Sequence, residues 1–157
     1  MVTRLPSTAL SGLVPTVTGI NVGEDDLTVY DEGTWTPVVK IGTTDITSAG
    51  SGGNFTRVGN VVMFTGALEF DRDVATGNVT VEGLPVASNA NNRSPVLVLA
   101  GDYVDNEPTI VGIVGQSTST ILLYVQPDST GAQPAQMSDT QFNAGARNMR
   151  ISGFYFV

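Results

Sequence analysis

The side chains of this chain that could carry out acid–base chemistry are carboxylates in two short clusters. The clusters consist of Glu69, Asp71 and Asp73, and of Asp102, Asp105 and Glu107. Glycoside hydrolysis uses a pair of carboxylates, one of which protonates the leaving group. Each cluster falls where a predicted strand meets a turn, and acidic residues are frequent in turns for conformational reasons alone. We therefore interpret both clusters as turn residues rather than a catalytic pair.

Other catalytic chemistries lack the residues that they need. The 157-residue sequence contains neither histidine nor cysteine, so Ser-His-Asp and Cys-His arrangements are impossible. Histidine is also the commonest metal ligand. The sequence contains neither a G-x-S-x-G nucleophile elbow nor a phosphate-binding P-loop. We expect no enzymatic activity and no cofactor.

An acidic run lies close to the first predicted strand. It comprises Glu24, Asp25 and Asp26, followed by Asp31 and Glu32. A calcium site needs about six to eight oxygen ligands, usually with alternating spacing and a glycine turn. That spacing is missing, so the run is interpreted as a solvated group of charges. We expect no metal.

Charge and hydropathy limit the possible partners. The formal net charge is -8 with a single lysine, which argues against nucleic acid, because nucleic-acid binding needs clustered cations. No apolar run approaches the roughly 20 residues needed to span a bilayer. Pro6 and Pro15 interrupt the apolar N-terminus, so we expect no signal peptide. Charged residues form only 14% of the chain, which indicates surface buried in an oligomer or an uncharged polar exterior.

Polar loops make binding a better hypothesis than catalysis. Surfaces that bind sugars use aromatic rings and planar polar groups. The candidate ligand-binding residues are Asn89, Asn91, Asn92, Arg93, Asp102 and Tyr103. Asn106, Gln133 and Gln136 are further polar candidates. Each could equally be an ordinary loop residue, and the sequence leaves that alternative open.

The hydrophobic pattern predicts short strands separated by turns. Residues 55–58 and 61–70 form the strongest hairpin signal, across a turn at Gly59-Asn60. The predicted core face of the second strand consists of Val62, Phe64, Gly66, Leu68 and Phe70. Glycine in the middle of that strand predicts a bulge or close packing.

The other predicted strands occur at a spacing typical of a sandwich or barrel. They are residues 34–41, 79–81, 96–100, 109–114, 120–126 and 149–157. In the first of these strands, Trp35 shares a face with Val39 and Ile41 and is predicted to be a core residue. Residues 96–100 are apolar throughout, which predicts a buried strand. Residues 137–145 could hold one helical turn.

The length fits one domain with a substantial core. Residues 29–157 form this domain, an all-β antiparallel sandwich of jelly-roll type. Residues 1–28 differ, because they are apolar but interrupted by proline, and they predict an extended arm. The arm either packs on its own domain or docks elsewhere.

Four sequence elements occur in a recognisable order from residue 29 onward. They are Glu32-Gly33-Thr34-Trp35-Thr36-Pro37, Asn54-Phe55-Thr56-Arg57-Val58-Gly59-Asn60-Val61-Val62, Gly83-Leu84-Pro85 and Ile151-Ser152-Gly153-Phe154-Tyr155. This order resembles the tip domain of bacteriophage tail fibres and tailspikes. The resemblance implies a homotrimeric virion protein without membrane insertion, most naturally a tail fibre or receptor-binding tip that contacts host surface polysaccharide. The arm, residues 1–28, would then bind other virion proteins.

Two other functions stay open at this point. Fibre tips normally follow a shaft and an anchor, whereas only a short arm precedes the tip-like domain here. The alternative is a capsid decoration (cement) protein, a small β trimer whose arm clamps the shell. A third hypothesis is a stand-alone carbohydrate-binding module, which would bind sugar saturably without its arm.

Overall fold

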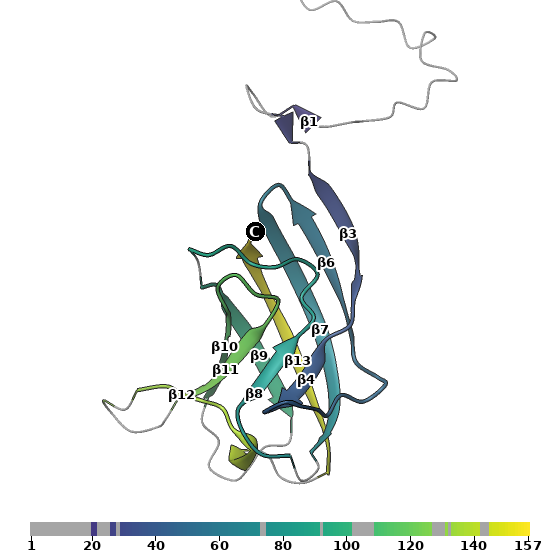
Figure 1. The fold of residues 1–157 in the computed structure, drawn as a ribbon. Helices are drawn as coiled ribbons and strands as arrows, with labels where there is room; N and C mark the ends of the chain where they lie inside the picture. Colours follow the sequence, from purple (N-terminus) through teal and green to yellow (C-terminus); the bar gives the residue numbers. More distant parts are fainter. Residues whose placement is uncertain are drawn as a thin grey trace, which may run out of the picture.

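The computed structural model describes residues 20–21, 26–27, 29–72, 75–91, 93–101, 109–126, 131, 133–141 and 145–157. Nearly all of these residues lie in or between antiparallel strands (Figure 1). The predicted all-β antiparallel class is confirmed. The described part of the chain contains no helix long and apolar enough to cross a membrane.

Thirteen strands and one 3-10 turn make up the described structure. The first strands are β1 (Ile20–Asn21), β2 (Asp26–Leu27), β3 (Tyr30–Trp35), β4 (Val38–Ile41), β5 (Thr44–Asp45), β6 (Gly52–Val58) and β7 (Val61–Arg72). They are followed by β8 (Val79–Glu82), β9 (Pro95–Gly101), β10 (Thr109–Val114), β11 (Ile121–Gln126), β12 (Ala135–Gln136), the 3-10 turn Asp139–Gln141 and β13 (Gly145–Phe156). The 3-10 turn lies where the sequence predicted a single helical turn.

One large sheet contains every strand from β3 onward, in the order β3-β6-β7-β13-β9-β10-β11-β8-β4-β5, with β12 on β11. The sheet curls so that β4, β8 and β11 lie in front of β7, β13 and β9 (Figure 1). β1 and β2 pair only with each other in a separate two-stranded sheet. They are the described part of the predicted arm, and the rest of the arm lies outside the described residues.

The curled sheet closes on itself at one end. After β5, Thr47 forms an antiparallel bridge with Phe70 of β7. The N–H of Ser48 donates to the carbonyl of Glu69 at 2.7 Å, and the N–H of Asp71 donates to the carbonyl of Ile46 at 3.1 Å. The other half of β7 pairs instead with β6, across the predicted turn at Gly59-Asn60. β7 therefore joins the segment after β5 to the β6 side of the sheet.

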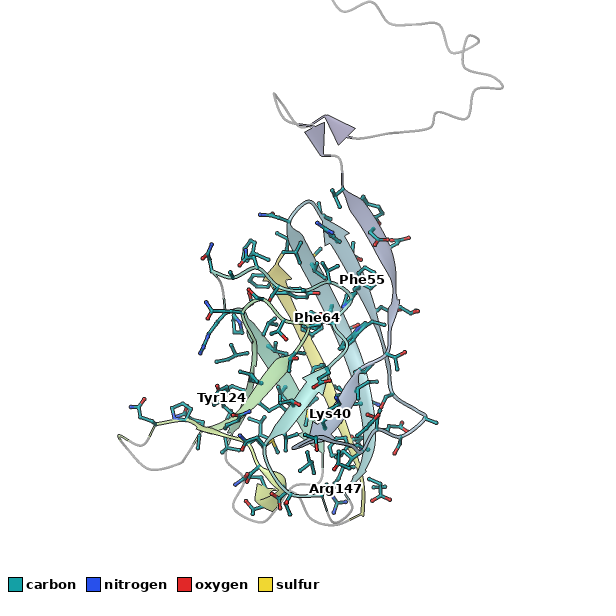
Figure 2. The ribbon with its side chains drawn as sticks, in the orientation of Figure 1. Lys40, Phe55, Phe64, Tyr124 and Arg147 are labelled. Carbon is teal, nitrogen blue, oxygen red and sulfur yellow. The ribbon has the colours of Figure 1, made fainter. Side chains whose placement is uncertain are left out.

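The inward side chains of the two layers form one core. The five residues predicted for the core face of β7 all point inward, and Phe64 lies between the layers in Figure 2. Inward residues of β13 continue this core, with Met149 opposite Leu68 and Tyr155 opposite Val62. Phe64 meets the rings of Trp35 and Tyr155 edge-on, at centroid distances of 5.8 and 5.9 Å. The alternation of the sequence therefore identified the inward face of β7.

Trp35 is a core residue, as predicted, and two glycines make room for it. It is 6% exposed, and its Nε1 donates to the carbonyl of Thr65 at 2.9 Å. A Cβ added at Gly66 would lie 3.1 Å from the indole, and one at Gly53 would collide with Nε1 and with that carbonyl. The strand register runs unbroken past Gly66. Close packing, rather than a bulge, explains this glycine.

Two strand predictions were wrong in detail. Residues 34–41 do not form one strand, because the chain turns at Thr36 and Pro37 and β3 and β4 pair with different neighbours. Residues 96–100 were predicted to be buried, yet Leu97 and Leu99 on the outer face of β9 are 72% and 70% exposed. Burial depends on what covers the outer face, and hydropathy along one strand does not supply that information.

We predict opposite effects for alanine at two adjacent glycines. Gly53→Ala should lower the free energy of unfolding by about 1–3 kcal/mol, because the new methyl group collides with Trp35 and Thr65. Gly52→Ala is the matched control, since a Cβ there meets nothing within 4 Å. It should be neutral or stabilising by about 0.4–1 kcal/mol. Urea unfolding followed by fluorescence of the single tryptophan measures both, and equal effects would contradict the packing argument.

Candidate functional site

The first group of candidate ligand-binding residues lies in the loop between β8 and β9. Asn91 and Arg93 are exposed, whereas Asn89 is half-buried. The N–H of Asn89 donates to the carbonyl of Phe156 at 2.9 Å, and its side-chain Oδ1 accepts from the N–H of Asn91 at 3.1 Å. Asn89 therefore has a structural role in shaping the loop, and Asn91 and Arg93 are the members of this group that face solvent.

Buried hydroxyl groups hold this loop against the sheet. The Oγ of Ser88 donates to the carbonyl of Gly115 and accepts from the N–H of Thr118 at 3.3 Å. The hydroxyl of Tyr155 donates to the carbonyl of Val86 at 2.9 Å and accepts from its N–H at 3.3 Å. Ser88 at the start of this loop is buried, whereas Asn91 and Arg93 are exposed. Hydrogen bonds from Ser88 and Tyr155 thus fix the side of the loop that faces the sheet, and its solvent-facing side is polar.

The remaining candidates, Asn92, Asp102 and Tyr103, lie outside the described residues. The two ends of the intervening strand β9 lie far apart. Arg93 lies just before the seven-residue strand β9, and Gly101 ends it. At about 3.3 Å per residue, these ends are roughly 20 Å apart. Gly101, the last described residue before Asp102, therefore lies far from the Asn89–Arg93 loop.

A second polar surface lies at the end of the sheet where β13 begins. Gln136, a predicted candidate, belongs to β12, a strand that the sequence did not predict. Its Oε1 accepts from Nδ2 of Asn78 at 3.1 Å. Nearby, the Oγ of Ser138 donates to Oε1 of Gln141 at 2.9 Å. We call Asn78, Gln136, Ser138 and Gln141 the amide rim, and its groups can bind polar ligands such as sugars.

The described carboxylates do not form a catalytic pair in a depression. Glu69 and Asp71 share the outer face of β7, while Asp73 and the second cluster lie outside the described residues. A depression of about 210 Å³ includes Glu69 but not Asp71 among its lining residues. Within the described ranges, no group of three acidic residues could hold a metal ion.

A hollow in the described structure lies on the outer face across β6, β7, β13 and β9. It measures about 410 Å³ and includes Leu97, Leu99 and Arg150 in its lining. Three of its other lining residues are small: Gly52, Ala67 and Ser152. The sequence analysis missed this surface. The available signal was the apolar run 96–100, whose alternate residues must face outward in any sheet.

Comparison with known proteins supplies one structural likeness. No family model matches this chain, and no curated protein matches it. The crystal structure of the Dettilon tailspike protein (gp208) is similar, with a TM-score of 0.57 and 14% identity over 80% of this chain. The match covers 24% of the tailspike chain, so this chain corresponds to about a quarter of that protein's length. At this identity the likeness establishes the fold.

Tyr155 should make the protein less stable at alkaline pH. Burial raises the pKa of its phenol above the ordinary value of 10.0. Above about pH 10 the unfolded chain therefore loses this proton first, and the free energy of unfolding falls. Tyr155→Phe should cost about 1–3 kcal/mol at neutral pH, because the backbone groups of Val86 lose their partner.

Urea unfolding of both proteins at pH 7 and at about pH 11 tests this prediction. The difference between wild type and Tyr155→Phe should shrink at the higher pH. Tyr124→Phe, on the outer face of β11, is the control for losing a tyrosine. An unchanged difference would show that Tyr155 does not titrate as proposed.

Proposed function

We propose that this chain is a structural protein of a bacteriophage virion and forms the receptor-binding tip of a tail fibre or tailspike. The likeness of its curled sheet to a tailspike structure carries the proposal. The ordered motifs from Glu32 to Tyr155 support it independently, because they were identified without the structure. The ligand would be host surface polysaccharide.

The proposed assembly is a homotrimer that binds through several weak contacts. Three sites on one trimer, repeated over several trimers, give avidity without a single tight site. The low charge of the chain and the exposed leucines of β9 support burial of outer surface between copies. The proposed activity is binding without catalysis.

The arm suggests which end of the domain faces the host. β1 and β2 precede β3 beyond the end of the sheet at which β13 finishes (Figure 1). If residues 1–28 attach to other virion proteins, the opposite end is exposed at the tip. The amide rim lies at that opposite end. The Asn89–Arg93 loop lies at the arm end, close to Phe156.

Immunogold labelling of intact virions tests the location. An antibody against this protein should label the tail or its fibres in negative-stain electron micrographs. Label distributed over the head would contradict the tail proposal and favour a capsid decoration protein. Virions incubated with pre-immune serum provide the control.

Competition for adsorption identifies the host-facing end. Soluble protein should slow phage adsorption, and Gln136→Ala in the amide rim should weaken this competition about tenfold, through loss of a hydrogen-bonding group at each repeated site. Gln116→Ala is matched at the other end, where its Nε2 donates to the carbonyl of Ala90 at 2.8 Å. Loss of competition by Gln116→Ala alone would assign binding to the Asn89–Arg93 loop.

A further inference from the structure

The outer face of β9 is the most exposed apolar surface of the described structure. Leu97 and Leu99 are more than two-thirds exposed, although β9 lies between β13 and β10 in the interior of the sheet. On the next strands, Phe154 and Met63 are opposite each other and about half exposed. A strand that is apolar on both faces is typical of a strand covered on both. The described residues cover only one face of β9.

The hollow beside these leucines is suited to a bulky side chain. Gly52 leaves open space above the sheet, since a Cβ there would meet nothing within 4 Å. The neighbouring lining residues Ala67 and Ser152 are also small. Arg150 is the one charged residue among those that line the hollow. A large apolar side chain with an acid next to it would complement this surface.

The same chain carries such a pair at the edge of its sheet. β3 is the first strand in the sheet order, so one of its sides has no neighbouring strand. Tyr30 on this strand is 61% exposed, and its hydroxyl donates to Oε2 of Glu32 at 2.6 Å. Both residues alternate with inward-facing Trp35 and therefore point outward. We call Tyr30 and Glu32 the tyrosine edge.

The tyrosine edge cannot reach the hollow within one copy. Tyr30 is opposite Val58 of β6, whereas Gly52 begins that strand. Gly52 lies six residues from Val58, about 20 Å at roughly 3.3 Å per residue, and Asn54, the nearest hollow-lining residue of β6, lies about 13 Å from Val58. A tyrosine edge that occupies the hollow must therefore come from a second copy.

We propose that the hollow of one copy binds the tyrosine edge of a second copy, with Tyr30 against Leu97 and Leu99 and with Glu32 paired to Arg150. The contact joins two different surfaces, so it is head-to-tail and closes into a ring when the rotation permits. The number of copies in the ring, three, rests on the homotrimer of the proposed function. The contact itself rests on the surfaces described above.

One pair of opposite charges, Arg150 in the hollow and Glu32 on the tyrosine edge, favours a second copy as the occupant. Two chains of net charge -8 repel each other except where opposite charges meet. The lining of the hollow contains no acid and one arginine, and the tyrosine edge offers an acid. Leucine side chains give a sugar no hydrogen bonds. An anionic membrane would be repelled by the net charge.

Filling the hollow provides the first test. Full-length wild type should have a molar mass about three times the 16.4 kDa of the chain by light scattering. Gly52→Phe places a ring in the hollow, and its Cβ meets nothing within 4 Å. It should weaken association about 30-fold or more, as expected for loss of an interface hot spot. Thr44→Phe, at an exposed position of β5, is the matched control and should remain associated.

Circular dichroism and thermal unfolding establish that the Gly52→Phe chain is folded. A folded variant that stays trimeric would overturn the assigned contact. A wild-type dimer would overturn the proposed head-to-tail ring, because a two-fold axis pairs the surfaces of both copies reciprocally. A monomeric wild type would overturn the association, whereas the virion labelling tests the proposed function separately.

Exchanging the two charges provides the second test. Glu32→Lys and Arg150→Glu should each weaken association, since each places like charges across the contact. The double variant restores opposite charges and should associate within a few-fold of wild type. Two weakened single variants whose combination remains weak would overturn the proposed pairing.

Discussion

The packing of Trp35 is the contact on which the curled sheet depends. Its indole lies at the end of β3, meets Phe64 of β7 edge-on and donates to the carbonyl of Thr65. Directly after it the chain turns at Thr36 and Pro37 and continues as β4 in the opposite layer. Because the hydrogen bond and the ring contact both fix the same residue, the crossing between layers is anchored at this point. Gly53 and Gly66 are required by the size of the indole rather than by local turns.

The second constraint is the long strand β7, which pairs along its length with three different segments. β13 covers one side throughout, while β6 and residues 46–48 share the other. This division closes one end of the sheet and leaves β3 as an edge at the other end. The closed end carries the amide rim, and the open end carries the arm and the tyrosine edge. A single pairing pattern thus gives the domain two chemically different ends.

The outer face shows how this chain folds with so few charges. The described ranges contain an ion pair between Lys40 Nζ and Glu82 Oε2, at 2.7 Å. Exposed pairs of this kind add little stability. Most of the free energy must come from apolar burial, and the proposed association would extend that burial to the exposed leucines of β9. Under the proposed association, assembly and stability use the same kind of interaction.

The sequence by itself determined the local elements of this protein. The β6–β7 and β10–β11 hairpins, the core face of β7, the burial of Trp35 and the 3-10 turn follow from alternation and turn residues, which act over a few positions. Only the tertiary structure decided the strand order, the closure by residues 46–48, the short strand β12 and the exposure of Leu97 and Leu99. The same is true of the separation between Arg93 and the end of β9. These features depend on contacts between residues distant in the chain. A local hydrophobic pattern predicts which residues avoid water, but it does not predict which segments cover them.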